Sequence, residues 1–198
     1  MTETNPPADP LDADPALASA ILEIESHLAQ DGWDQPARLY ALVDTARLVS
    51  HEPALAAAMG LDHASEQGSL TAIEQDQLSP EVELERALET ISWPPEVLGC
   101  AAVVERLVLP PDADAQIPED ETEAQRYARE HPDRQEVRIV AGATRHGATY
   151  CALRLRAHDD DQSVVGGVDL VPGLLALLGA TLTDEPDTAE SAEPEENP

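Results

Sequence analysis

Two stretches of alternating residues, on either side of Arg145-His146-Gly147, most constrain how this chain can fold. They lie between Arg134 and Arg156, and apolar side chains occupy every second position in each. Alternation with a period of two indicates a half-buried antiparallel hairpin. One face of this hairpin is apolar and requires a covering layer, whereas the other face carries arginines.

The position of the arginines limits the possible registers of the hairpin. A two-residue loop would pair Ile139 with Arg154 and would set an apolar face against a charged one. A three- or five-residue loop places Arg138 opposite Arg154 or Arg156, and in the first of these registers Glu136 also faces Arg156. Directly opposed like charges destabilise a strand pair, so we expect acidic side chains to lie over this face.

Other segments of the chain show helical or strand periodicity. The predicted helices cover residues 14–31, 50–60, 79–91, 122–131 and 169–182, and the predicted strands outside the hairpin cover residues 37–43 and 97–109. Residues 61–79 have the polar composition of turns. On the first helix, Glu23, Glu25 and His27 fall on the side expected to face solvent.

These elements predict an α+β fold for a single domain over residues 14–182. We expect a mostly antiparallel four-stranded sheet, with two long helices packed on one face and small helices in the connections. The flanking residues 1–13 and 183–198 are acidic and rich in proline, which predicts two disordered tails.

The charge of the chain limits its partners. The formal net charge is −29, from 40 acidic residues and 11 basic ones, and every basic residue is an arginine. Such a charge disfavours nucleic acid and anionic membranes as partners but permits a basic protein partner. The sequence contains no apolar run of the roughly 18 residues that a membrane helix needs, and its N-terminus lacks the basic region of a secretory signal. We therefore expect a cytoplasmic protein without membrane insertion.

The sequence contains no recognisable catalytic or cofactor motif. Cys100 and Cys151 lie in apolar runs and are expected to be buried, reduced thiols. The histidines are scattered without metal-ligand spacing, and no glycine-rich phosphate loop is present. We expect no catalytic residue, no metal site and no cofactor, so a role other than an enzyme is favoured.

Two blocks of sequence resemble a known family. WDQPARLYALVDTA at residues 33–46 and GCAAVVERL at residues 99–107 are similar to blocks of a small, uncharacterised family of acidic actinobacterial proteins. The resemblance covers about residues 15–182 and implies a single-domain cytoplasmic protein. The family has no assigned activity, cofactor or catalytic residues, so it implies none for this chain.

Three functions are compatible with these observations. The first is a non-catalytic binding or assembly module that associates with itself or with a protein partner through its polar sheet face or acidic surface. The second is a small-anion-binding protein or enzyme with an arginine-lined sheet face. The third is a nucleic-acid mimic that binds a basic protein.

The second function depends on five arginines. Arginine suits anion binding because its charge is permanent and its donors are bidentate. The candidate binding residues are Arg38, Arg106, Arg138, Arg154 and Arg156. Arg106 joins the others only if Cys100, Ala102 and Val104 point to the same face. The competing interpretation is that Glu136, Glu105 or acids of residues 112–121 pair with these arginines internally.

Overall fold

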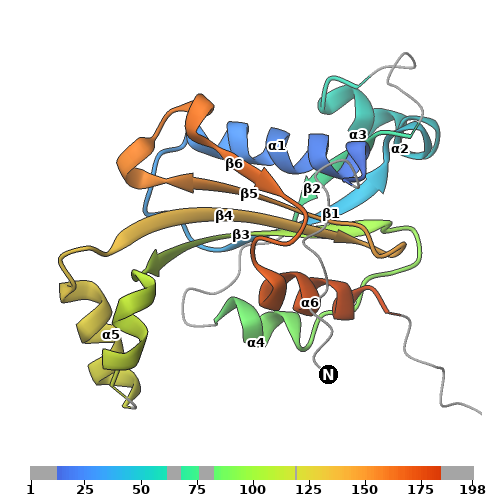
Figure 1. Ribbon diagram of the computed structural model, residues 1–198. Helices are drawn as coiled ribbons and strands as arrows, with labels where there is room; N and C mark the ends of the chain where they lie inside the picture. The colour runs from blue at the N-terminus through green and yellow to red at the C-terminus, as the bar shows by residue number, and fades with distance from the viewer. Residues whose placement is uncertain (1–12, 62–67, 76–82, 119, 184–198) are drawn as a thin grey trace, which may run out of the picture.

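The computed structural model describes residues 13–61, 68–75, 83–118 and 120–183 (Figure 1). These residues form a sheet of six strands in the order β2-β1-β3-β4-β5-β6, in which every neighbouring pair is antiparallel. The strands are β1 (Arg38–Asp44), β2 (Leu70–Glu74), β3 (Gly99–Val108), β4 (Gln135–Thr144), β5 (Thr149–Leu155) and β6 (Val165–Gly167).

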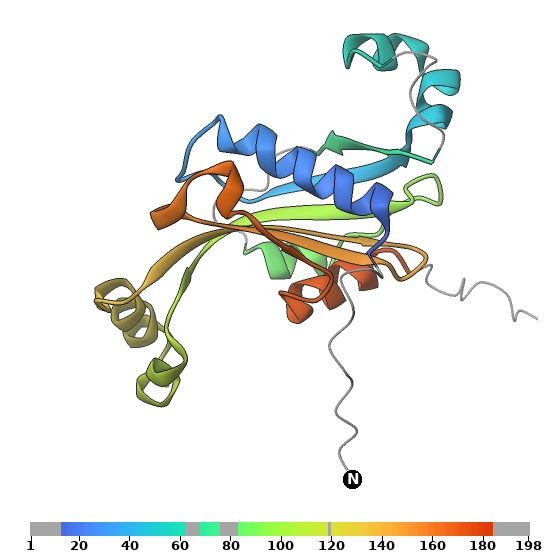
Figure 2. The ribbon, with the colours of Figure 1, turned by 45° about the horizontal axis from the view of Figure 1, so that its top comes forward.

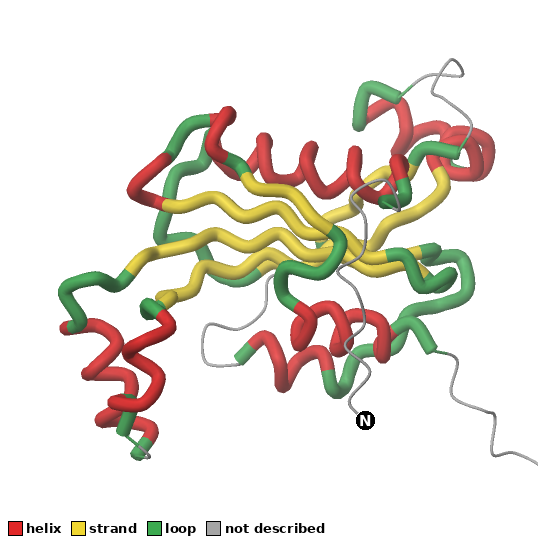
Figure 3. The backbone as a smooth tube through the Cα atoms, in the orientation of Figure 1, coloured by secondary structure: helices red, strands yellow, loops and turns green. Residues whose placement is uncertain are grey.

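Helices cover both faces of the sheet. Helix α1 (Pro15–Ala29) lies across one face, and α4 (Leu84–Leu88) and α6 (Pro172–Thr181) lie on the other (Figure 3). Helices α2 (Thr45–His51) and α3 (Pro53–Ala58) follow β1. Helix α5 (Glu121–Glu130) and the 3-10 helix η2 (Pro111–Gln116) stand away from the sheet, beyond the ends of β3 and β4 (Figure 2). Two more 3-10 turns, η3 (Arg156–His158) and η4 (Asp161–Ser163), link β5 to β6.

The predicted α+β class and the antiparallel sheet are confirmed, but the predicted strand number and helix placement are wrong. The sheet has six strands instead of four, because β2 lies within the predicted turn region and β6 is only three residues long. Helices α1 and α6 pack on opposite faces. The central strand β3 is apolar on both faces, and such a strand must be covered on both sides.

The two faces of the sheet carry two separate hydrophobic cores. The core under α6 contains the odd-numbered positions of β4, from Val137 to Ala143, together with Cys100, Cys151 and Leu178. The core under α1 contains Leu17, Ile21, Ala101, Val140 and Ala152. The alternation predicted for the hairpin is therefore observed, and the arginine-bearing face is the one that α1 covers.

The hairpin adopts the register that places Glu136 opposite Arg156. Arg138 is paired with Arg154, and the Thr144 N–H donates to the Ala148 carbonyl across a three-residue loop. Gly147 supports this loop with a φ of 83°, a conformation that favours glycine.

The start of α1 follows the sequence prediction. Asp14 caps the helix by accepting hydrogen bonds from the Ala16 and Leu17 N–H groups, and Pro15 occupies the first turn.

Residues 1–12 and 184–198, which hold nearly all of the two predicted tails, lie outside the described residues, as do residues 79–82 of one predicted helix. Across the described ranges, none of the helices has the length and apolar character needed to cross a membrane.

The close approach of α1 to the sheet depends on Gly142 in β4. A Cβ atom at this position would lie 2.5 Å from Ile21 Cδ1 and 3.2 Å from Leu17 Cδ1. We expect Gly142→Val to lower the free energy of unfolding by about 1–3 kcal/mol, because it overpacks this contact. Urea denaturation measures the change. As a control, Gly179→Ala in α6 meets nothing within 4 Å and should be neutral or stabilising; equal losses in both variants would contradict the prediction.

Candidate functional site

The structure brings four of the five candidate arginines together on the face covered by α1. Arg38, Arg138 and Arg154 lie on β1, β4 and β5, and Arg156 follows β5 directly. Arg106 is not part of this group, because it shares the opposite face with Cys100, Ala102 and Val104. There it pairs with Glu85 at 2.5 Å, in a contact in which both side chains are exposed.

Arg154 is at the centre of this arginine network, which we define as Arg38, Arg138, Arg154, Arg156 and their acidic partners. Its side chain is only 2% exposed and donates to both carboxylate oxygens of Glu25 in α1, at 2.5 and 2.8 Å, and to Asp161 at 2.9 Å. These hydrogen bonds, led by that of Glu25, raise the pKa of Arg154 above its ordinary value. The expectation that Glu25 faces solvent is wrong, since this residue is 2% exposed.

Arg138 and Arg156 are held by the loop between α1 and β1. The Arg138 guanidinium is 1% exposed, lies 4.5 Å from the ring centroid of Trp33 and pairs with Glu105 at 2.9 Å. Arg156 lies 5.6 Å from the same ring centroid. It pairs with Asp34 at 2.9 Å and with Glu136 at 2.6 Å. The hydrogen bond from Arg156 lowers the pKa of Asp34.

The network contains two carboxylates for every arginine. Arg38 contacts Asp31 at 3.3 Å and Glu74 at 3.5 Å. The four arginines are thereby matched by eight carboxylates: Glu25, Asp31, Asp34, Glu74, Glu105, Glu136, Asp159 and Asp161. The predicted acidic cover is therefore present, and Glu105 and Glu136 are among the acids that supply it. A network of this composition has no net positive charge with which to attract an anion.

Two buried donors in the network have no hydrogen-bond partner among the described residues. They are Arg38 Nε and Arg138 Nη1. A buried polar group without a partner is unfavourable, so each of these atoms marks a place where a water molecule or a small polar ligand would be stabilised.

A separate, open groove lies between the other flank of α1 and strand β2. It has a volume of about 400 Å³, within the range of ligand-binding clefts. Ser19, Glu23 and His27 line it from successive turns of α1, and Leu70 and Ala72 line it from β2. The remaining lining residues are Ala16, Ile24, Tyr40, Thr45, Met59, Leu61, Ser69 and Thr71.

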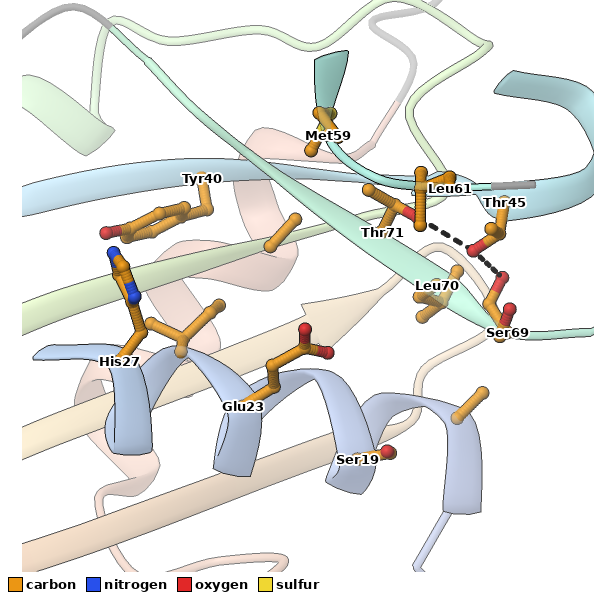
Figure 4. A pocket seen from close by; sticks show the side chains of 13 residues that line it. Ser19, Glu23, His27, Tyr40, Thr45, Met59, Leu61, Ser69, Leu70 and Thr71 are labelled. Atoms are coloured by element: carbon orange, nitrogen blue, oxygen red, sulfur yellow. Dashed lines mark hydrogen bonds between the residues drawn. The ribbon is translucent and has the colours of Figure 1, made fainter. Parts of the chain in front are cut away.

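The polar groups of the groove differ in their availability. The Thr45 hydroxyl contacts that of Thr71 at 2.8 Å, and Tyr40 donates to Glu74 over 3.4 Å. The exposed Glu23 side chain extends from α1 toward β2 and has no partner among the described residues, and His27 stands beside Tyr40 (Figure 4). The groove therefore offers a free carboxylate above a partly apolar floor.

The sequence did not indicate this groove. Glu23 and His27 were expected at the surface and are exposed, but nothing identified the strand opposite them. The available signal was the spacing of Ser19, Glu23 and His27, which places three polar side chains on one flank of the helix.

The two cysteines are poorly suited to nucleophilic chemistry. Cys100 and Cys151 are fully buried, as predicted, and burial raises the pKa of the Cys100 thiol to about 11. A thiol with this pKa is overwhelmingly protonated near neutral pH and is a poor nucleophile. No cluster of three or more His, Cys, Asp or Glu that could hold a metal ion occurs in the part of the chain that the structure describes.

The fold and these sites define an α+β domain with a six-stranded antiparallel sheet, a closed arginine network and an open groove beside an edge strand. The model of the PPA1309-like protein family matches residues 17–183, and the chain belongs to this family. Neither the curated proteins nor the solved structures contain a match to the chain.

The buried pair in the network predicts a large effect of a single substitution. Arg154→Met leaves Glu25 buried without its partner, and we expect it to lower the free energy of unfolding by about 3–5 kcal/mol. The double variant Arg154→Met/Glu25→Leu should recover much of this loss, since it removes both charges. Chemical denaturation at neutral pH measures both values.

The exposed pair on the opposite face is the matched control. Arg106→Met should cost only about 0–1 kcal/mol, because both partners of that pair are exposed. If Arg154→Met proved no more destabilising than Arg106→Met, the network would not be holding α1 to the sheet.

Proposed function

We propose that the protein is a non-catalytic binding module and that its binding site is the groove between α1 and β2. The observation that carries this proposal is the combination of an open hollow with the unpaired carboxylate of Glu23 at its wall. A cleft with an apolar floor and a few directed polar groups is the usual form of a binding site.

The internal pairing of the arginines supports a site away from the polar sheet face. The face is covered by α1, and its guanidinium groups already contact carboxylates. Of the two surfaces considered from the sequence, the acidic surface is therefore the better candidate for recognition. The groove is a place where that surface is hollowed and carries a carboxylate without a partner among the described residues.

A photo-crosslinking experiment tests this function. A photoreactive amino acid at position 19, on the wall of the groove, should crosslink a discrete partner in the native cells. The same amino acid at position 22, which is exposed on α1, lies about 100° around the helix from Glu23 and does not line the groove, should not.

Binding of the partner must also require the free volume of the groove. Ser19→Trp should abolish co-purification of the crosslinked partner, whereas Leu22→Trp should retain it with an unchanged melting temperature. Equal crosslinking from both positions, or retention of the partner by Ser19→Trp, would place the binding surface elsewhere.

A second candidate function is the binding of a small anion within the arginine network. The excess of carboxylates in the network opposes an anion, but the two unpartnered donors of Arg38 and Arg138 would supply hydrogen bonds to it. Under this candidate, phosphate or sulfate at low salt raises the melting temperature beyond the effect of chloride at equal ionic strength. Arg38→Gln abolishes that shift and Arg106→Met leaves it intact. If no anion exceeds chloride, buried water is the partner of these donors and the candidate fails.

A further inference from the structure

The edge strand β2 presents a row of outward-facing backbone groups. The Thr45 N–H donates to Ser69, and the Gln75 N–H donates to Leu39, on the side of β1. Because bonding directions alternate along an antiparallel pair, residues 71 and 73 also bond toward β1. The N–H and C=O groups of Leu70, Ala72 and Glu74 therefore point away from the sheet, and no strand among the described residues pairs with them.

Two of these residues, Leu70 and Ala72, also form the floor of the groove. Leu70 and Ala72 belong to the apolar layer under α1, so a strand added beside β2 would point every second side chain toward that helix. Ser19 lies toward the Ser69 end of the groove and His27 toward the Tyr40 end (Figure 4). Helix residues four apart are about 6 Å apart along the axis, and alternate strand residues are about 6.6 Å apart. Successive side chains of an added strand would thus meet successive turns of α1.

From this geometry we propose that β2 accepts an extended segment of a partner polypeptide as an additional strand, with a lysine or arginine side chain directed toward Glu23. Backbone hydrogen bonds to an exposed edge give affinity in this mode of recognition, and pockets for alternate side chains give specificity. The proposal rests on the proposed function, since it uses the same groove, and it adds the class of ligand and the way in which it is held.

Charge identifies the occupant as a basic segment of another protein. Glu23 has no cationic partner, and the chain carries a net charge of −29, so a second copy of this chain would be repelled. All eleven basic residues lie within the described ranges 13–61, 83–118 and 120–183. Residues 1–12, 62–67, 76–82 and 184–198 contain neither lysine nor arginine. None of these segments can supply the positive side chain from within the same molecule.

A displayed library of random linear heptapeptides, selected on the full-length immobilised chain, tests the proposal. We expect selected peptides to carry a lysine or arginine at a fixed position. Glu23→Arg should weaken their binding at least tenfold, whereas Glu89→Arg, an exposed acid on the far side of the sheet, should change it less than twofold. Peptides without a basic residue, no enrichment at all, or insensitivity to Glu23→Arg would overturn the proposal.

Strand addition itself is tested at Ala72, whose N–H points outward. Ala72→Pro removes that donor without removing a hydrogen bond to β1, so the domain should stay folded while peptide binding falls at least tenfold. Ala72→Ser retains the N–H and should bind as the wild type does. Amide hydrogen exchange of Leu70, Ala72 and Glu74 should slow when the peptide is added.

The same variants distinguish a failure of strand addition from a failure of the groove as a binding site. If Ser19→Trp blocks the peptides but Ala72→Pro does not, the groove is a binding site and strand addition is wrong. If neither variant affects binding, both proposals fail. If the wild-type chain forms a dimer that Ala72→Pro converts to a monomer, the edge is occupied by a second copy and the assignment of a basic partner is wrong.

Discussion

The contact between Arg154 and Glu25 is the interaction on which the arrangement of this domain most depends. An arginine buried in the middle of a sheet face is tolerated only when a carboxylate neutralises it at hydrogen-bonding distance. Glu25 meets this requirement from α1, so the pair fixes both the position of the helix along β5 and the depth at which it packs. The loop after α1 continues the same contact through Trp33 and Asp34, which hold Arg138 and Arg156.

The position of α1 in turn explains why the domain has an open groove. The helix is tied to β4 and β5 by its buried residues, including Ile21 over Gly142 and Glu25 over Arg154. Its opposite flank faces β1 and β2, where Leu70 and Ala72 are only partly buried. The arginine network and the groove therefore both result from the position of α1. Charge pairing closes the network on one side of the helix, and the groove on the other side stays uncovered.

Because carboxylates of the network neutralise its arginines, these arginines do not offset the negative charge of the other acidic residues at the surface. Four of the eleven arginines are matched there by eight carboxylates, so they contribute little positive potential at the surface. Glu23 lies outside these pairs, and its field is not offset by a neighbouring guanidinium. A partner that approaches α1 from the side of the groove therefore meets an unpaired carboxylate, that of Glu23. On the side of the network, the Glu25 carboxylate is already paired with Arg154.

The sequence by itself determined the α+β class, the hairpin of β4 and β5, the cap of α1 and the burial of both cysteines. Each of these follows from local alternation, helix-start signals or apolar surroundings, which depend only on residues close together in the sequence. The sequence limited the register of the hairpin to two possibilities, and the structure selected the one that pairs Arg138 with Arg154. Only the tertiary structure decided that α1 and α6 lie on opposite faces, that LTAIE is an edge strand, and that Glu25 is buried while Glu23 is free. Two carboxylates separated by one helical residue look alike in sequence. What separates them is an arginine 129 positions farther along the chain, which only folding places opposite one of them.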